Sequence, residues 1–461
     1  MGIGGNGGDV GHSGDIDGSA EVSETTEVSE PGMRSSEEME IGNYELEHQE
    51  YGKELDKISK LGENPENEMT ELSGKVLELV QPDYDEAQEL AKDNEEGRTF
   101  TDHGTEHVEM VSGKILEISD AMRDAFDEET LGNKNLENRI SFNPDMDTKT
   151  LVGSAISHDT GMKGDGYALV QNPDKSYAKN EDGNYILREE SNLDFKEVRD
   201  NHSLNSAINI LENREAYQEL GYSDEQIDKM AAECMAHSKS HSGVGDLHSK
   251  ADWSDCFDRM CSAVEAYNTD HPESPIAFDR SQFESSEEKM GQLAAETFAL
   301  RIADVSRDSG ADAESQSGEI VHVERSSVNS HGGSVEAEIA DAKITIGENG
   351  ELITNEKSKQ VHIGEQNIIH NRTFVDENGR LTHRITVDDG GYAPSCTQGA
   401  ISDHLGEFAS ARDEAFRVEV EFDKPCDGFA EDSYETFRDI AASNSDNRNI
   451  TIVYPWDKED V

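Results

Sequence analysis

The chain has 461 residues and a formal net charge of -61, because 101 acidic residues outnumber 40 basic ones. A field of this sign repels nucleic-acid backbones and anionic membrane surfaces, so neither is expected as a partner. It also repels a phosphorylated ligand, unless a local cluster of cations reverses the potential. Solubility or adaptation to high salt accounts for the acidity better than a specific acidic-partner role.

At 461 residues the chain is too long to fold around a single hydrophobic core, so it should divide into two or three units. Only 33% of its residues are hydrophobic, so part of it is expected to be unstructured. The sequence contains neither a long apolar run nor a basic-then-apolar start, so no spanning helix or secretory signal is expected. Its five cysteines form no CxxC pair, which predicts reduced thiols in a cytoplasmic protein.

The N-terminal region divides into a tail and a charged helical extension. Residues 1–35 are rich in Gly, Ser and acidic residues and are predicted to be disordered. In residues 36–98, apolar residues recur at spacings of three and four, which predicts helix. Pro82 is expected to break this helix, with a second one restarting at Tyr84. The pair could dock on the next domain or form a coiled coil, and the few repeats favour docking.

Helical periodicity dominates residues 99–309, where five successive apolar faces predict a mainly α domain with a substantial core. An insertion at 164–190 interrupts the series. Within it, the Asp182-Gly183 step predicts a small hairpin.

In residues 310–461 the spacing of apolar residues changes from a helical period to a mixture of strand and helix patterns. This mixture predicts a small α+β domain. Strands are expected at 343–346, 360–363, 382–387, 416–422 and 450–454, with helices at 398–412 and 431–442. Asn349-Gly350 and Asn378-Gly379 predict hairpin turns. Four of the histidines in this domain show no ligand spacing and are expected at the surface: His362, His370, His383 and His404. Its role in oligomerisation, regulation or partner docking is left open.

Histidine and aspartate recur at the ends of the apolar helices of 99–309. His103 and His107 lie one helical turn apart at a predicted helix start, so both can point the same way. His158 and Asp159 follow an apolar run. Adjacent residues diverge by about 100° on a straight helix, but at a helix end both can reach one metal ion.

Three further elements continue this pattern. His202 is expected to open a helix, His237 and His241 again lie one turn apart, and Asp304 follows an apolar segment. The core of a helical bundle is where such ligands converge on metals. Imidazole and carboxylate together suit Fe, Mn, Ni or Zn rather than Ca.

In this order, the motifs resemble those of the HD superfamily of metal-dependent phosphohydrolases. The superfamily's core His, His-Asp and final Asp match His107, His158, Asp159 and Asp304. The resemblance covers residues 99–309, under half of the chain. It implies an HD-type helical domain in these residues, which the small α+β domain predicted above would follow.

The resemblance also implies two divalent metal ions bridged by Asp159. His107, His158 and Asp304 would hold one ion, and His202 with His237 the other. His237 is preferred to His241 because it directly ends an apolar run. The resemblance places three more residues near substrate or in support of the ligands: His103, His241 and Arg301.

The implied reaction is attack on phosphorus by a metal-activated hydroxide, positioned by Asp159. Lys163 is the second predicted catalytic residue, and cationic contacts to phosphate are expected from among Lys163, Lys239, Lys250, Arg259 and Arg301. The expected substrate is a nucleotide or related small phosphorylated molecule, cleaved as a monoester or diester. Met162 stands where the cyclic di-GMP subgroup has lysine, which disfavours that substrate. The alternative is a non-catalytic sensor, and a homo-oligomer through the helical extension or the C-terminal domain is left open.

Overall fold

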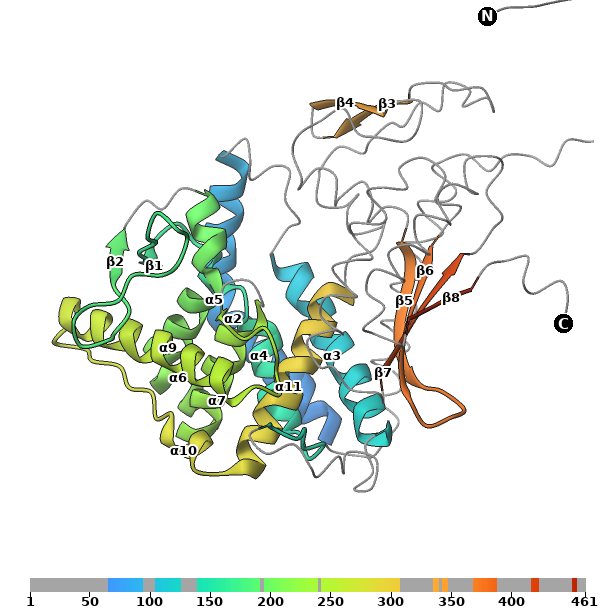
Figure 1. The fold of residues 1–461 in the computed structure, drawn as a ribbon, viewed down its shortest axis with the longest axis horizontal. Helices are drawn as coiled ribbons and strands as arrows, with labels where there is room; N and C mark the ends of the chain where they lie inside the picture. Colours follow the sequence, from blue (N-terminus) through green and yellow to red (C-terminus); the bar gives the residue numbers. More distant parts are fainter. Residues whose placement is uncertain are drawn as a thin grey trace, which may run out of the picture. The chain divides into compact units, whose positions relative to one another are not determined.

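The computed structural model describes residues 65–93, 104–125, 139–190, 195–238, 242–306, 335–339, 342–346, 368–387, 416–422 and 450–453. These segments are mostly helical, with small sheets (Figure 1). None of the helices within them is both long and apolar enough to cross a bilayer. The predicted tail at 1–35 and the predicted helices at 398–412 and 431–442 lie outside the described residues.

The helices follow the predicted apolar faces. Their bounds are α2 Pro65–Asp93, α3 Thr105–Ala125, α4 Thr148–Ser157, η2 Thr160–Met162, α5 Phe195–Glu212, α6 Arg214–Glu219, α7 Asp224–His237, α9 Lys250–Asp270, α10 Ser281–Glu284 and α11 Glu287–Ser306. Helix α7 begins with a capping box, in which Ser223 and Gln226 each bond the other's backbone N–H. This fixes where α7 starts, and so which of its residues reach the bundle interior.

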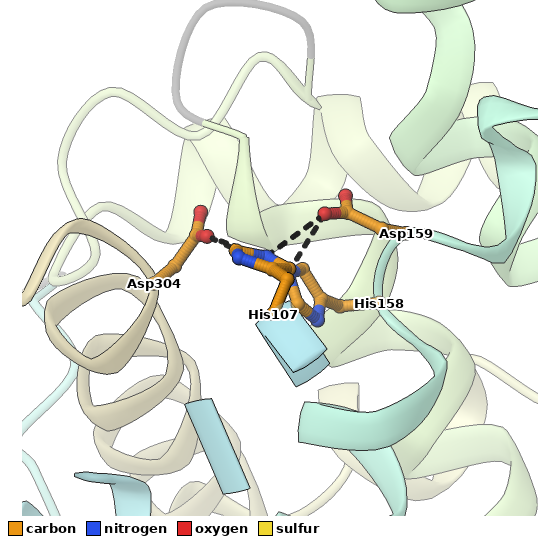
Figure 2. A group of neighbouring side chains, drawn as sticks. All are labelled: His107, His158, Asp159 and Asp304. Carbon is orange, nitrogen blue, oxygen red and sulfur yellow. Dashed lines mark hydrogen bonds and ion pairs between the residues drawn. The ribbon is translucent and has the colours of Figure 1, made fainter. Parts of the chain in front are cut away.

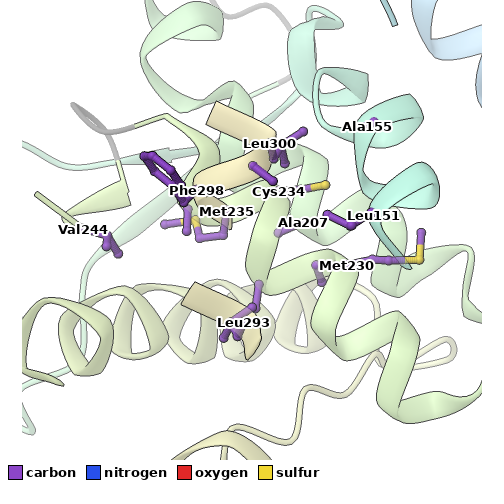
Figure 3. Packing of buried hydrophobic residues seen from close by; sticks show 14 of the residues in the cluster. Leu151, Ala155, Ala207, Met230, Cys234, Met235, Val244, Leu293, Phe298 and Leu300 are labelled. Carbon is purple, nitrogen blue, oxygen red and sulfur yellow. The ribbon is translucent and has the colours of Figure 1, made fainter. Parts of the chain in front are cut away.

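The core lies where α4, α5, α7 and α11 meet (Figure 3). Leu151, Ala207, Met230, Leu293 and Phe298 are each at most 1% exposed. Burying a large apolar side chain of this kind stabilises the fold by about 1.5–3 kcal/mol. The core therefore fixes the relative positions of four of the helices that carry the polar residues of the site.

Helix α2 is continuous through Pro82, so the predicted break there is wrong. Proline removes one backbone donor, but packing on both sides of it holds the helix together. Val76, Val80 and Tyr84 are buried in the same core as α4, and the Tyr84 hydroxyl donates to the Ile156 carbonyl at 2.7 Å. The extension thus docks on the bundle.

The predicted hairpin in the insertion is confirmed. Strand β1 (Gly166–Leu169) pairs antiparallel with β2 (Leu187–Glu190). Gly183 turns the chain with φ +90°, a conformation that glycine adopts without strain. The Tyr167 amide donates to Asn205 Oδ1 at 2.8 Å, which ties the hairpin to α5.

The C-terminal strands form two sheets. One is the hairpin of β3 (Val335–Ile339) and β4 (Ala342–Ile346). The other has the order β5-β6-β7-β8, with bounds Ile368–Val375, Leu381–Val387, Phe416–Phe422 and Ile450–Val453. Asn378-Gly379 makes the β5–β6 turn as predicted, with Gly379 at φ +74°. The predicted strand at 360–363 and turn at 349–350 lie outside the described residues.

Strands β6, β7 and β8 pair in parallel, which requires crossover connections. The two predicted helices fall in those connecting intervals. The prediction that His383 is a surface residue is wrong: it is fully buried, and its Nδ1 lies 3.1 Å from Thr373 Oγ1. Its place on an inward-facing position of β6 explains this, since strand residues alternate between faces. The side chains of His362, His370 and His404 are not among those described.

Candidate metal centre

Four predicted ligands converge where α3, α4 and α11 meet (Figure 2). His107 Nε2 lies 3.1 Å from His158 Nε2 and 3.2 Å from Asp159 Oδ2. Asp304 Oδ1 lies 3.4 Å from His107 Nε2 and 3.5 Å from His158 Nε2. These four side chains form one group that could hold a metal ion.

A second group adjoins the first through Asp159. His202 Nε2 and His237 Nε2 lie 3.0 Å apart, and each lies 3.5 Å from Asp159 Oδ1. Asp159 therefore presents Oδ2 to the first group and Oδ1 to the second. A carboxylate placed in this way can be shared by two metal ions.

The end of α4 explains how adjacent residues reach one point. The helix stops at Ser157, His158 is its C-cap, and Asp159 leaves the helical conformation with φ -109° and ψ 9°. As a result His158 Nε2 and Asp159 Oδ2 lie only 3.1 Å apart. His202 was expected to open its helix, but α5 begins at Phe195 and His202 lies within it. Burial of Val198 accounts for the earlier start.

Three of the histidines are oriented by the same local hydrogen bond. In His158, His202 and His237, Nδ1 bonds the carbonyl three residues earlier, at 2.8, 2.6 and 2.6 Å. A carbonyl accepts only, so each Nδ1 carries the hydrogen. In the neutral imidazole, Nε2 is then a bare lone pair, the form that binds metals.

These bare nitrogens fit a cation. Lone pairs 3.0 Å apart beside a carboxylate repel each other unless a positive charge lies between them. Ligands about 2.1 Å from one ion are separated by about 3.0 Å in an octahedron and about 3.4 Å in a tetrahedron. The observed separations of 3.0–3.5 Å fall in this range. Nitrogen and oxygen donors together suit a transition metal rather than calcium.

The pKa values of His158 and Asp304 are shifted by the close packing of carboxylates and imidazoles at the site. Burial opposes protonation of His158, but Asp159 and Asp304 outweigh it and raise its pKa to about 10. Withdrawal from water would raise the pKa of Asp304, yet hydrogen bonds with His107 and His158 hold it well below its usual range. The site therefore favours a cation, whether a proton or a metal.

The other predicted site residues have different places. Lys163 Nζ lies 3.0 Å from Asp83 Oδ1 on α2, and both side chains are 21% exposed. This pairing raises the pKa of Lys163 against the opposing effect of burial, so the side chain stays cationic. His103 and His241 lie outside the described residues.

Arg301 supports the ligands from within the core, where it is 1% exposed. Its Nε and Nη2 donate to the Ala236 carbonyl at 2.9 and 2.5 Å, and Nη2 also donates to the Val244 carbonyl at 2.9 Å. The guanidinium satisfies the Ala236 carbonyl at the C-terminus of α7 and complements the dipole of that helix. Arg301 thus joins α11, which carries Asp304, to the end of α7, which carries His237.

Gly161 is a site residue that the sequence analysis missed. A Cβ there would lie 2.1 Å from the His202 carbonyl and 2.5 Å from the Ser206 nitrogen. The Gly161 amide donates to Ser206 Oγ at 2.8 Å. Only glycine allows η2 to lie this close to α5, and this approach brings Asp159 to His202. The sole sequence signal was a glycine two positions after the His-Asp pair.

We expect Gly161→Ala to lower the free energy of unfolding by about 1–3 kcal/mol, since η2 must shift away from backbone atoms. The shift separates Asp159 from His202 and should selectively weaken metal binding by the second group. Gly164→Ala is the matched control, because its Cβ would meet nothing closer than Leu90 at 3.5 Å. Urea unfolding and metal titration measure both effects. Unchanged binding of two metals by Gly161→Ala would contradict this role.

The six predicted ligands are thus contributed by α3, the end of α4, α5, α7 and α11. These six side chains make up the candidate site through their positions and their nitrogen and oxygen donor atoms. Comparisons of the chain with protein-family models, with characterised proteins and with solved structures gave no match.

Proposed function

We propose that the protein is a metal-dependent phosphohydrolase of the HD type, acting on a nucleotide or related small phosphorylated molecule. One observation carries the proposal: two groups of mostly buried histidines and aspartates share Asp159, and the Nε2 atoms and carboxylate oxygens within each group lie close enough together to favour a bound cation. Two bound divalent ions would lower the pKa of water and offset the charge of a phosphoryl group. The six ligands follow the order of the HD motifs.

The chain's own residues define how a substrate reaches the centre. Asp304 has a side chain 28% exposed, whereas those of His107, His158 and Asp159 are at most 3% exposed. The open side of the first group is therefore at Asp304, and the phosphoryl group would enter there. Asp159 and the four histidines form the inner wall and exclude water behind it.

Lys163 remains the proposed cationic or proton-donating partner of the substrate. It is held by Asp83, so this role requires Lys163 to exchange the Asp83 carboxylate for a substrate phosphate. Arg301 is assigned a supporting role, because its guanidinium donates to backbone carbonyls. It is not proposed to contact the substrate.

The test combines metal counting with turnover. The full chain is stripped of metal, reconstituted separately with Mn²⁺, Fe²⁺, Ni²⁺ and Zn²⁺, and analysed by mass spectrometry. It is then assayed on p-nitrophenyl phosphate, bis(p-nitrophenyl) phosphate, nucleoside monophosphates and cyclic nucleotides. The proposal expects about two metals per chain and turnover of at least one ester class.

The other outcomes decide against the proposal in different ways. Two metals without turnover of any phosphate ester would favour a metal- or nucleotide-binding sensor instead. Absence of stoichiometric metal would show that the two ligand groups serve another purpose.

A further inference from the structure

The end of α4 determines where two of the candidate ligands lie, because His158 and Asp159 follow it directly. The last four carbonyls of a helix have no partner within that helix. In α4 each of these four carbonyls accepts from a side chain. The contacts are Ser154 with Cys234 Sγ at 3.5 Å, Ala155 with His158 Nδ1 at 2.8 Å, Ile156 with the Tyr84 hydroxyl at 2.7 Å, and Ser157 with Thr160 Oγ1 at 3.0 Å.

Tyr84 is the donor that the helical extension α2 contributes to this end. Its side chain is fully buried and lies in the same apolar core as α4. Burial raises the pKa of Tyr84 well above its usual range, and the charge of Asp159 raises it further, so the hydroxyl keeps its hydrogen. The hydrogen bond therefore fixes the extension to a carbonyl two residues before His158.

The same turn of α2 also contacts the start of α3. Gln81 Nε2 donates to Thr105 Oγ1 at 2.9 Å. Thr105 is the first residue of α3 and stands two residues before His107. Gln81 and Tyr84 lie one turn apart, so a single turn of α2 meets the segments that carry both histidines of the first ligand group.

A third contact of this turn lies beyond the shared ligand. Asp83 Oδ1 is 3.0 Å from Lys163 Nζ, four residues after Asp159. One turn further along α2, Ala87 lies in one apolar cluster with Met162 of η2. The segment that contains Asp159 is therefore held by α2 on both sides, at the end of α4 and at the end of η2.

We propose that residues 81–84 of α2 are a positioning element of the metal centre and that Tyr84 is its principal residue. The Tyr84 hydroxyl holds the end of α4 and thereby sets where His158 and Asp159 lie. Gln81 acts in the same way on the start of α3. The extension is thus a working part of the centre, although it supplies no metal ligand itself. This inference rests on the metal centre of the proposed function and does not require cleavage of a phosphate ester.

The test titrates the metal-free full chain with Co²⁺, whose visible absorption depends on the geometry of its ligands. Tyr84→Phe removes only the hydroxyl. It should weaken Co²⁺ binding about tenfold and alter the spectrum of the bound ion, because residues that orient metal ligands contribute about 10–100-fold to affinity.

Tyr222→Phe is the matched control. Tyr222 is also buried, and its hydroxyl donates to the Lys149 carbonyl at 3.2 Å, in the first turn of the same helix α4. The two variants therefore each lose one hydroxyl bonded to an α4 carbonyl, but at opposite ends of the helix. Tyr222→Phe should leave the Co²⁺ affinity and spectrum unchanged.

A second variant keeps the test independent of whether Tyr84→Phe folds. Gln81→Leu removes the hydrogen bond to Thr105 and leaves the hydroxyl of Tyr84 in place. It should weaken Co²⁺ binding by about threefold or more, as the loss of one orienting hydrogen bond predicts.

Three results would decide against the inference. Wild-type affinity and spectrum in both Tyr84→Phe and Gln81→Leu would overturn it. An equal change in Tyr222→Phe would also overturn it, because the effect would then come from the stability of α4 as a whole. Failure of the wild-type chain to bind Co²⁺ would exclude the metal centre and the inference with it. Co²⁺ binding without turnover of any phosphate ester would count against the proposed function alone, so the two can fail separately.

Discussion

Asp159→Asn should remove most of the metal binding that is proposed for the two ligand groups. Asparagine keeps the shape of the side chain but loses the charge and one of the two oxygens that face the ligand groups. Losing the shared ligand should weaken metal affinity by at least about 100-fold, since even supporting residues around metal sites contribute 10–100-fold. Phosphoesterase activity, if the proposed function holds, should disappear with the metal.

Thermal unfolding with and without metal measures this directly. A ligand present at 100 times its dissociation constant stabilises the fold by about 2.7 kcal/mol, which wild type should show and Asp159→Asn should not. The metal-free forms should melt close together, because the apolar core is the same in both. Asp120→Asn is the control, an exposed carboxylate on α3 that pairs with Arg123 at the surface. Retention of wild-type metal affinity by Asp159→Asn would exclude Asp159 as the shared ligand.

The sequence predicted the parts of the fold that depend on periodicity. The apolar positions at spacings of three and four mark the buried faces of the bundle helices, and the Asp-Gly and Asn-Gly steps mark two hairpin turns. Five of the six candidate metal ligands were found because they stand near the boundaries of those helices, whereas His202 lies within α5. A boundary aims a side chain into the bundle, as His158 and Asp159 show at the end of α4.

The sequence could not predict which residues of different helices contact one another. Pro82 was expected to end a helix, because its lost hydrogen bond is local while the packing of Val76 and Tyr84 that compensates for it is not. Gly161 looked like an ordinary turn residue until its distance to the His202 carbonyl was known. Arg301 looked like a phosphate contact, since its position in the sequence cannot show which carbonyls it meets.

A buried ionic cluster between α7 and α11 is the clearest case of this kind. Lys229, Glu233 and Glu296 are 7%, 0% and 0% exposed, although charges on helices usually lie at the surface. Lys229 Nζ lies 2.8 Å from Glu296 Oε2, and Glu296 Oε1 accepts from the Asp147 amide at 2.6 Å. Burial and the neighbouring Glu296 raise the pKa of Glu233 well above its usual range, which favours its protonated form, while Lys229 pairs with Glu296.

Lys229→Met should therefore destabilise the protein by about 3–5 kcal/mol at neutral pH, because it leaves a buried carboxylate without its counter-ion. The surface pair of Lys289 with Glu225 gives the control, and Lys289→Met should cost at most about 1 kcal/mol. Adding Glu296→Gln to Lys229→Met should recover part of the loss, as a double-mutant cycle by urea unfolding would show. If both lysine variants lose the same small amount, the buried pair is not what holds these helices together.

The loss caused by Lys229→Met should also depend on pH, in a direction set by the carboxyl groups. Burial and Glu296 already raise the pKa of Glu233 well above its ordinary value of 4.5, and removing Lys229 takes away a charge that lowers it. A group of this kind contributes stability that is fully present below its unfolded pKa and is lost as the pH rises through its folded pKa. The deficit of Lys229→Met should thus be smaller at pH 5 than at pH 8, where ionisation of Glu233 favours the unfolded chain. An equal deficit at the two pH values would mean that the removal of Lys229 does not raise the pKa of Glu233. Unfolding curves at the two pH values decide between these states of the cluster.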